Sequence, residues 1–358
     1  MKIGRGFFVH VALLGLAVLA AVLVWTRDKQ PKTLAQGDVT VWAGRSADVE
    51  RISFEGKAKK VSLEAKKDAA GTYFVGTVEK EVAAPKKDPH GHDAADAGAD
   101  AGPDTDAGAD TAEPAPAKER STMTLVSIAG AQKLVEQLAP LKALRSIGRI
   151  GDDRAAEFGL NEPEGTLTVK IGQAERKLIF GGQTPGGGDR YARDPASGEV
   201  FAVKGEIFRN LDGAESNLME RGLHEWPESD VGAATITAQG KTRSLVRGGE
   251  ERKRFWADPS APETNDETAG NWMSKLDRLR PTEYALTPPA GAEVVARVDF
   301  TGPGGVAKLG YLELIKAPAA ASGGKPDYYI VTERTRLHAK VPAQAAEQVE
   351  QDVGSVLK

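Results

Sequence analysis

One long apolar run opens the chain, and beyond it apolar and polar positions alternate over short distances. The run is Phe7–Trp25, nineteen residues with no formal charge at neutral pH. A helix of this length reaches roughly 28 Å, close to the hydrocarbon thickness of a bilayer. The pattern predicts that residues 1–32 are an N-terminal anchor, with a transmembrane helix over 7–25 that contacts the lipid bilayer.

A cleaved secretory signal is the alternative interpretation of this run. Such a signal has a shorter apolar core of roughly 7–15 residues and ends in a small-x-small site. Here Ala20 and Ala21 are followed by Val22–Trp25, so a cut after them would leave apolar residues at the new terminus. The pattern favours an uncleaved anchor, and cleavage stays open as the alternative. Lys2 and Arg5 precede the helix, which favours a cytoplasmic amino terminus, although Arg27, Lys29 and Lys32 after it weaken this bias.

Short period-2 runs between turn residues follow the anchor and predict strands. Residues 33–48 are expected to be a short juxtamembrane connection. Apolar residues at a spacing of three to four predict helices, the second of them capped by Asp152 and followed by Gly159. The strands predicted in this part cover 49–54, 61–63, 73–75, 167–171, 177–180, 190–193 and 200–203, and the helices cover 131–141, 153–158 and 206–211.

A segment rich in Ala, Asp, Gly and Pro interrupts this first half. Residues 83–119 contain no aromatic and no large aliphatic side chain, and nine acids stand against three lysines between Lys86 and Glu119. Such a segment buries too little apolar surface to offset the entropy of ordering it. The composition predicts a disordered acidic insertion over 83–119, with order resuming near Thr122.

The order of elements repeats after Trp226–Pro227. Both halves read β-β-β-α-β-β-β-β-α, and Arg190–Arg193 stands against Tyr328–Val331, about 138 residues further on. This pattern favours a tandem duplication, although a shared order of elements does not require shared descent. The strands predicted in the second half cover 234–238, 242–246, 254–257, 294–300, 308–314, 328–332 and 337–340, and the helices cover 269–279 and 343–357.

Short strands, tight turns and few helices indicate mainly antiparallel sheets and therefore the α+β fold class. The predicted domains are the anchor at 1–32, a first α+β unit at 33–225 that includes the insertion, and a second α+β unit at 226–358.

Composition excludes several function classes. The 358 residues are 40% hydrophobic and carry a net charge of −4, and outside the insertion lysine and arginine are mixed among acids. This is no electrostatic footprint for nucleic acid. Cysteine is absent, which removes disulfides, thiolate metal sites, a cysteine nucleophile and a lipid-modified cysteine.

Candidate metal sites lie in the acidic insertion. His90-Gly91-His92-Asp93 offers imidazole and carboxylate ligands, but a disordered loop loses entropy when it closes around an ion. Asp104–Gly108 partly matches a calcium loop, yet Ala107 stands where an oxygen ligand is required. A solvated linker is favoured over a metal site.

Candidate phosphate and catalytic motifs are equally weak. Gly240-Lys241-Thr242 follows a predicted strand rather than a glycine-rich loop, and Gly181–Gly188 lacks a lysine and a following helix, so a hairpin connection is favoured. Neither G-x-S-x-G nor H-E-x-x-H occurs. His224 and His338 are the histidines that a folded site outside the insertion could use. We predict no catalytic, cofactor-binding or metal-binding residue, and no cofactor.

Several local motifs resemble a known bacterial family. They are Arg154–Pro163 (RAAEFGLNEP), Leu167–Val169 (LTV), Phe180–Pro185 (FGGQTP), Tyr191–Arg193 (YAR) and Val200–Val203 (VFAV). Together they resemble the DUF4340 family, a domain of unknown function, over roughly residues 120–230, with looser similarity over 40–340. The motifs describe a helix end and hairpin turns, so the resemblance transfers no active-site residue. The long acidic insertion is not part of the family pattern.

The resemblance implies a cellular context. Members typically carry one N-terminal transmembrane helix and an extracytoplasmic body, and their genes often lie beside ATP-binding-cassette (ABC) transporters of the gliding-motility auxiliary type. This implies a single-pass protein of the bacterial inner membrane, with a cytoplasmic amino terminus and a periplasmic body.

The expected function is that of a non-enzymatic accessory protein of the cell envelope, with an ABC transporter or another envelope protein as its partner. The alternative is a periplasmic module that binds a polysaccharide, peptide or lipid between the halves near Leu223–Pro227. An envelope hydrolase would require a deep pocket in which His224 meets acidic residues.

Overall fold

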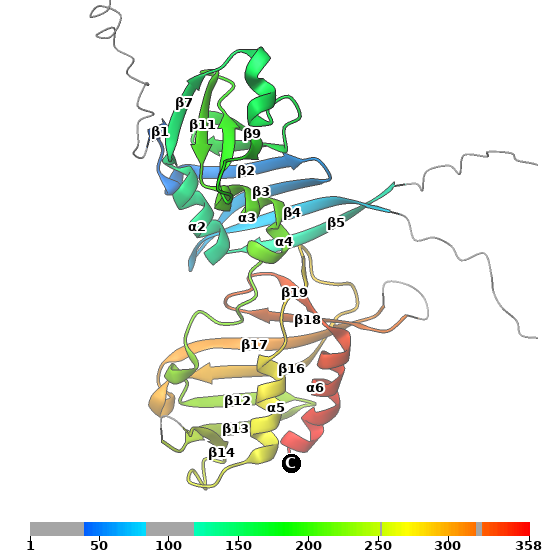
Figure 1. The fold of residues 1–358 in the computed structure, drawn as a ribbon. Helices are drawn as coiled ribbons and strands as arrows, with labels where there is room; N and C mark the ends of the chain where they lie inside the picture. The colour runs from blue at the N-terminus through cyan, green and yellow to red at the C-terminus, as the bar shows by residue number, and fades with distance from the viewer. Residues whose placement is uncertain (1–38, 84–117, 251–252, 320–323) are drawn as a thin grey trace, which may run out of the picture.

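The computed structural model of this chain describes residues 39–83, 118–250, 253–319 and 324–358 (Figure 1). The predicted anchor at 1–32, with its helix at 7–25, lies outside these ranges, as does most of the predicted insertion at 83–119. Within the described ranges, no helix has the length and apolar character needed to cross a bilayer.

A nine-stranded sheet forms the first half, in the order β5-β4-β3-β2-β8-β9-β10-β11-β7. Its strands are β2 (Val49–Gly56), β3 (Lys59–Asp68), β4 (Gly71–Ala83), β5 (Lys118–Ser127), β7 (Arg145–Arg149), β8 (Gly165–Ile171), β9 (Ala174–Gln183), β10 (Arg190–Arg193) and β11 (Glu199–Val203). A separate two-stranded sheet pairs β1 (Val39–Trp42) with β6 (Leu141–Ala143). The helices here are η1 (Ser46–Asp48), α2 (Ala129–Leu138), η2 (Asp152–Phe158), α3 (Gly205–Asp212) and α4 (Ala214–Asn217), where η marks a 3₁₀ helix.

An eight-stranded sheet forms the second half, in the order β14-β13-β12-β16-β17-β18-β19-β15. Its strands are β12 (Ala233–Ala238), β13 (Lys241–Gly248), β14 (Phe255–Ala257), β15 (Glu283–Ala285), β16 (Glu293–Thr301), β17 (Lys308–Ala317), β18 (Asp327–Thr332) and β19 (His338–Val341). The helices are η3 (Glu228–Asp230), α5 (Glu267–Asp277), η4 (Pro303–Gly305) and α6 (Ala343–Val356). Residues 218–232, which join α4 to β12, are called the connecting segment below.

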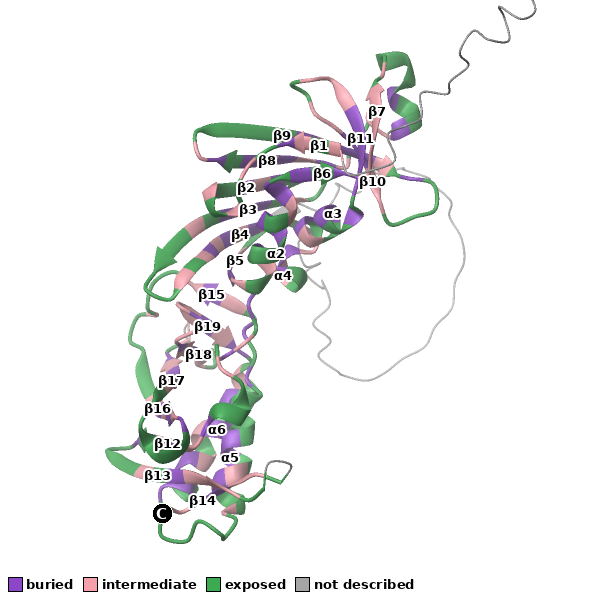
Figure 2. Cartoon of the chain, turned by 90° about the vertical axis from the view of Figure 1, so that its left-hand side faces the viewer, coloured by how far each residue is buried: buried purple, intermediate pink, exposed green. Residues whose placement is uncertain are grey.

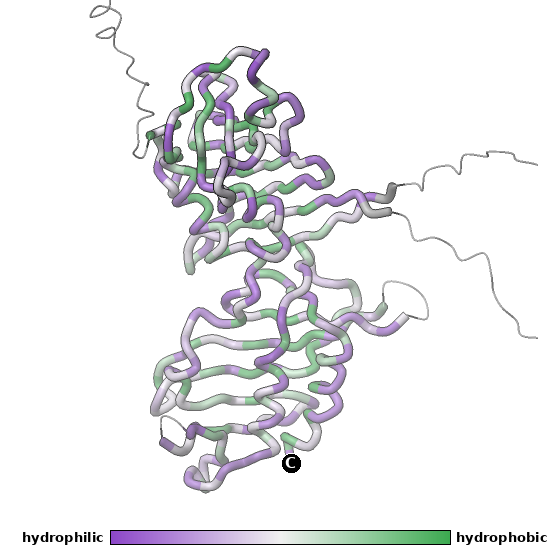
Figure 3. Tube along the Cα trace, in the orientation of Figure 1, coloured by the Kyte–Doolittle hydropathy of each residue, from purple (hydrophilic) through white to green (hydrophobic). Residues whose placement is uncertain are grey.

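The strand pairs that build these sheets are antiparallel throughout the described residues, which confirms the α+β class predicted from the short strands. In both halves the α-helices lie on one face of the sheet (Figures 1 and 2). Hydrophobic and hydrophilic positions alternate along the strands, as Figure 3 shows. In β2, for example, Ile52 and Phe54 are fully buried while Arg51 is exposed. This alternation arises because successive side chains of a strand point to opposite faces.

The two sheets have the same strand order once β5 is set aside. Strands β2, β3 and β4 of the first sheet hold the positions that β12, β13 and β14 hold in the second sheet. Strands β8, β9, β10 and β11 likewise correspond to β16, β17, β18 and β19. The edge strands β7 and β15 then correspond, as do the helices α2 and α5. The predicted correspondence of 190–193 with 328–331 falls on β10 and β18, which occupy the same place in their sheets.

Four local expectations differ from the structure. The helix expected over 131–141 ends at Leu138, and Leu141 begins β6. Residues 33–48, expected as a connection, include β1 and η1; the strand is held because the Trp42 indole Nε1 donates to the carbonyl of Leu138, 2.7 Å away. Strand β5 begins at Lys118, ahead of Thr122, because it pairs along β4. The helix at 153–158 is a 3₁₀ helix whose N-cap is Gly151 rather than Asp152, and Gly159 ends it in the left-handed conformation as expected.

The halves meet at the edge strands and through the connecting segment. Strand β15 lies beside β5. The Tyr284 hydroxyl donates to the backbone carbonyl of Glu220 over 2.8 Å, and the Arg334 guanidinium pairs with the buried Glu220 carboxylate over 3.0 Å. Buried apolar residues of both halves form one continuous core. The result is an elongated body with two sheets arranged end to end (Figure 2).

Candidate functional site

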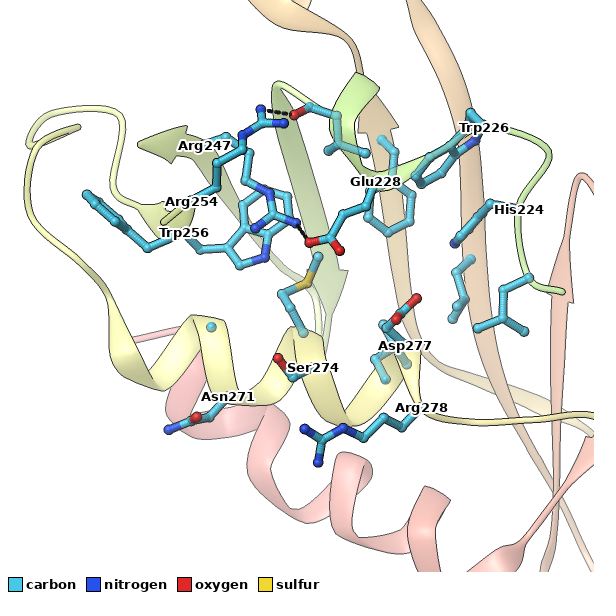
Figure 4. A pocket seen from close by; sticks show the side chains of 18 of the residues that line it. His224, Trp226, Glu228, Arg247, Arg254, Trp256, Asn271, Ser274, Asp277 and Arg278 are labelled. Carbon is cyan, nitrogen blue, oxygen red and sulfur yellow. Dashed lines mark hydrogen bonds and ion pairs between the residues drawn. The ribbon is translucent and has the colours of Figure 1, made fainter. Parts of the chain in front are cut away.

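A pocket of about 890 Å³ opens in the second half of the molecule. Its walls come from the connecting segment, strands β13 and β14, helix α5 and single residues of β16 and β17 (Figure 4). The size falls in the range of small-molecule sites. The alternative function was expected to use a cleft between the halves near Leu223–Pro227. The pocket uses part of that stretch but lies against the second sheet.

Aromatic rings form one wall. The imidazole of His224 stacks on the indole of Trp226, with ring centroids 4.0 Å apart and planes 21° from parallel. Phe300 contacts both rings at centroid distances of 5.0 Å. In Figure 4, His224 and Trp226 stand together on the side of the pocket opposite Arg247 and Trp256. This wall offers flat apolar faces at the mouth of a polar hollow.

A buried cation forms the opposite wall. The guanidinium of Arg247, on β13, lies 4.1 Å above the ring of Trp256 and has only 9% of its side chain exposed. It pairs with the carboxylate of Glu228, whose side chain is 78% exposed. Burial lowers the pKa of Arg247, and the neighbouring carboxylate partly offsets this effect. The site therefore keeps a desolvated positive charge with a solvent-facing counter-ion.

Arg254 fixes the strip of chain that carries Glu228. Its guanidinium donates to the backbone carbonyl of Ser229 over 2.7 Å and to that of Val231 over 2.6 Å. The backbone N–H of Arg247 donates to the carbonyl of Gly232 over 2.8 Å. These bonds hold the η3 turn against β13, and they thereby fix the backbone position of Glu228.

Two buried donors beside this pocket lack partners. Among the described residues, the Nε1 of Trp226 and the Nε of Arg247 make no hydrogen bond. A buried polar group without a partner costs roughly 1–3 kcal/mol, and such groups are uncommon in folded proteins. Both donors are therefore covered by the protein without an acceptor within reach.

Helix α5 supplies a polar rim. The Asp266 side chain caps this helix by accepting from the N–H of Ala269 over 2.9 Å. Exposed Asn271, Ser274 and Arg278 follow along the rim, and the Asp277 carboxylate points into the pocket from the helix end (Figure 4).

His224 is the sequence-predicted histidine that the structure places in this pocket. Its Nδ1 lies 3.0 Å from a carboxylate oxygen of Glu333, which leaves Nε2 as the atom available for proton transfer. Acidic Glu228 and Asp277 share the pocket, but within the described ranges no serine or threonine hydroxyl bonds to His224. The arrangement supports binding more directly than nucleophilic catalysis.

Residues 131–297 match the family described as "Domain of unknown function (DUF4340)". The chain resembles DUF4340. Neither the curated proteins nor the solved structures include a match to it. The DUF4340 match runs from α2 to β16. The sequence motifs resembled the family over roughly residues 120–230, with looser similarity over 40–340, so the match extends further into the second half than the first of these ranges. It includes most of the pocket walls and leaves out Phe300 and Leu312.

The other candidates from the sequence lie away from this pocket. His338 begins β19, where burial lowers its pKa. The glycine-rich stretch Gly181–Gly188 lies at the β9–β10 hairpin, as predicted, and Gly240 lies in the turn after strand β12. His90 and His92 lie outside the described residues, and within the described part no group of three or more His, Asp or Glu is placed to hold a metal ion.

Sequence reasoning missed Glu228, Arg247 and Trp256. Each belongs to a different element, and only the packing of β13 against η3 and β14 brings them together. The one local signal was the pair of tryptophans that flank this region, Trp226 and Trp256. Trp256 is 95% buried and also borders the pocket.

Proposed function

We propose that this chain is a non-enzymatic accessory protein of the bacterial cell envelope. Residues 7–25 anchor it in the inner membrane as a single pass, with the amino terminus in the cytoplasm and the two sheets in the periplasm. The body contacts an ABC transporter or another envelope protein. The observation that carries the proposal is the uncharged run of Phe7–Trp25 ahead of an elongated two-sheet body, and the DUF4340 resemblance supports the context.

We also propose that the two halves are repeated α+β units that arose by tandem duplication. The matching strand orders support this proposal. The nine-stranded sheet differs by β5, which follows the acidic segment and pairs with β4. A duplicated scaffold gives a long surface with two similar faces, and such a surface suits contact with large partners.

Membrane retention and partner capture test the leading function. A charged side chain at the centre of a bilayer-spanning helix costs about 2.5–3.5 kcal/mol in insertion. The double variant Leu14→Arg/Val18→Arg is therefore expected to lose the membrane fraction, whereas Leu14→Ile/Val18→Ile keeps it. Affinity capture from solubilised membranes is expected to recover transporter subunits with the wild type.

Two results would contradict this proposal. One is an intact wild-type chain in the soluble fraction. The other is capture, with the anchor in place, that recovers no envelope protein above the level of an unrelated anchored protein.

A specific observation favours a second function, the binding of a ligand in the periplasm. The pocket of about 890 Å³ has aromatic walls, a buried arginine and two donors without partners. A ligand that binds the native state raises its melting temperature. Thermal-shift screening of the purified chain against envelope saccharides, peptides and lipids tests this function, and the absence of any shift across the panel would remove it.

A further inference from the structure

We propose that the pocket between Arg247 and the His224–Trp226 pair binds an acidic saccharide, with the ligand's carboxylate replacing Glu228 on Arg247. This inference rests on the proposed ligand-binding function and names the chemical class of the ligand. The residues that carry it lie within the described part of the second half and the connecting segment.

The charge of the ligand follows from the asymmetry of the Arg247–Glu228 pair. Arg247 is 9% exposed and needs an anion beside it, because an unpaired buried charge is costly. Glu228 is 78% exposed and returns to water at little cost. An incoming carboxylate can take its place, and guanidinium groups favour carboxylates in a bidentate geometry.

The orphaned donors point to the same chemistry. Nε of Arg247 and Nε1 of Trp226 both require acceptors, and both are covered from solvent. A carboxylate in place of Glu228 would lie on the guanidinium to which Nε belongs. Carboxylate, hydroxyl and ring oxygens are all acceptors, whereas a cationic or purely apolar ligand would offer Arg247 no anionic acceptor.

A ring-shaped ligand fits the remaining walls. The stacked rings of His224 and Trp226 present flat faces, and the rim residues Asn271, Ser274 and Arg278 offer donors and acceptors for hydroxyl groups. A lipid chain would use only the aromatic wall and leave the polar rim without partners. A sugar ring has apolar faces and polar edges, so it can satisfy both surfaces at once.

The test uses the detergent-solubilised full chain and one matched pair of probes. These are tetragalacturonate and its fully methyl-esterified form, which differ only in charge and ester groups. Isothermal titration calorimetry measures the dissociation constant, and tryptophan fluorescence reports on the indoles of the pocket. We expect the acid to bind at least tenfold more tightly than the ester.

Three variants locate the binding. Glu228→Gln removes the internal competitor and is expected to tighten acid binding about threefold to tenfold. Arg247→Gln is expected to weaken it at least tenfold. Gly270→Leu is expected to block the site sterically without touching Arg247, because Gly270 lines the pocket and a Cβ there meets nothing within 4 Å.

Arg297→Gln is the matched control. Arg297 also lies over a ring, 4.4 Å from the centroid of Tyr311, and pairs with Glu313 over 2.6 Å, but it does not line the pocket. It should leave binding unchanged. Equal affinity for acid and ester, unchanged binding in Arg247→Gln, or persistent binding in Gly270→Leu would each overturn the proposal.

Absence of acid binding in both the wild type and Glu228→Gln would also overturn it. The thermal-shift panel distinguishes failure of the acidic-saccharide proposal from failure of the ligand-binding function. A shift with another ligand class refutes the acidic saccharide while the binding function stands, and no shift with any ligand refutes both.

Discussion

At the scale of single residues, Glu220 joins the two halves through its side chain and its backbone. Its side chain, 8% exposed, accepts hydrogen bonds from Arg334 of the second half and from the N–H of Gly222. Burial raises the pKa of Glu220, but the hydrogen bonds from Arg334 and Gly222 outweigh it, so the net pKa lies below the ordinary value. The ionised form therefore stabilises the folded chain.

Glu220→Gln is expected to lower the free energy of unfolding at pH 7 by about 2 kcal/mol, the range for hydrogen bonds to charged groups. Because the folded-state pKa is lowered, this contribution is present above the unfolded value near 4.3 and is lost as the pH falls through the folded-state pKa. Urea unfolding at pH 7 and near pH 3 measures the difference between wild type and variant. The difference should shrink at the lower pH.

Glu157→Gln is the control for this experiment. Glu157 pairs with Arg154 on the surface, where 57% of its side chain is exposed. Exposed pairs contribute little to stability. A loss in Glu220→Gln that stays constant across the pH range would show that Glu220 acts through shape rather than charge.

At the scale of elements, close backbone contacts explain two glycines of the first half. A Cβ on Gly181, in β9, would lie 2.2 Å from the carbonyl oxygen of Phe158 at the end of η2. A Cβ on Gly205, at the start of α3, would lie 1.6 Å from the carbonyl oxygen of Gly188. The glycines let the hairpin pack directly on η2 and α3, which is a structural role.

Gly181→Ala is expected to lower the free energy of unfolding by about 1–3 kcal/mol, the usual cost of overpacking. Gly270→Ala in α5 should instead raise it by about 0.5–1 kcal/mol, because alanine favours a helix and the site has open space. Chemical denaturation of the two variants beside the wild type measures both changes. Equal effects would contradict the role assigned to the Gly181 contact.

At the scale of the whole molecule, a few polar contacts join the first half to the second. Arg336, with 12% of its side chain exposed, pairs with Asp68 of the first half over 3.3 Å and with Glu225 over 2.5 Å. Its guanidinium also lies 6.0 Å from the ring of Tyr73. The pocket shares the connecting segment with this junction, since His224 reaches Glu333, three positions before Arg336.

Arg336→Gln is expected to loosen the junction without unfolding either sheet, because interfaces of this kind permit relative motion when contacts are removed. Hydrogen exchange of backbone amides in β5 and β15 should become several-fold faster, while exchange in β16 and β17 stays unchanged. Arg45→Gln, which removes an exposed pair with Asp48 inside the first half, is the control. Unchanged exchange at both edge strands would refute this role of Arg336.

The sequence by itself determined most of the fold. Alternation at 49–54 or 328–332 and the helical spacing at 343–357 are local patterns, and the structure confirms these elements because each buries the face that its pattern marks. It missed β1, β6, β7 and β15, which span only 3 to 5 residues and are strands because a neighbour pairs with them. Such pairings are long-range and leave little local signal.

The tertiary structure alone decided the candidate site. Glu228, Arg247 and Trp256 show no distinctive pattern in their own segments. They form a candidate site because the fold buries Arg247 against Trp256, pairs it with Glu228, and places all three beside the stacked rings of His224 and Trp226. A buried cation, a counter-ion at the rim and unsatisfied donors are properties of packing, which brings distant segments into one low-dielectric space. The pattern of apolar residues predicts which faces are buried, but only the folded chain shows which polar groups are buried with them.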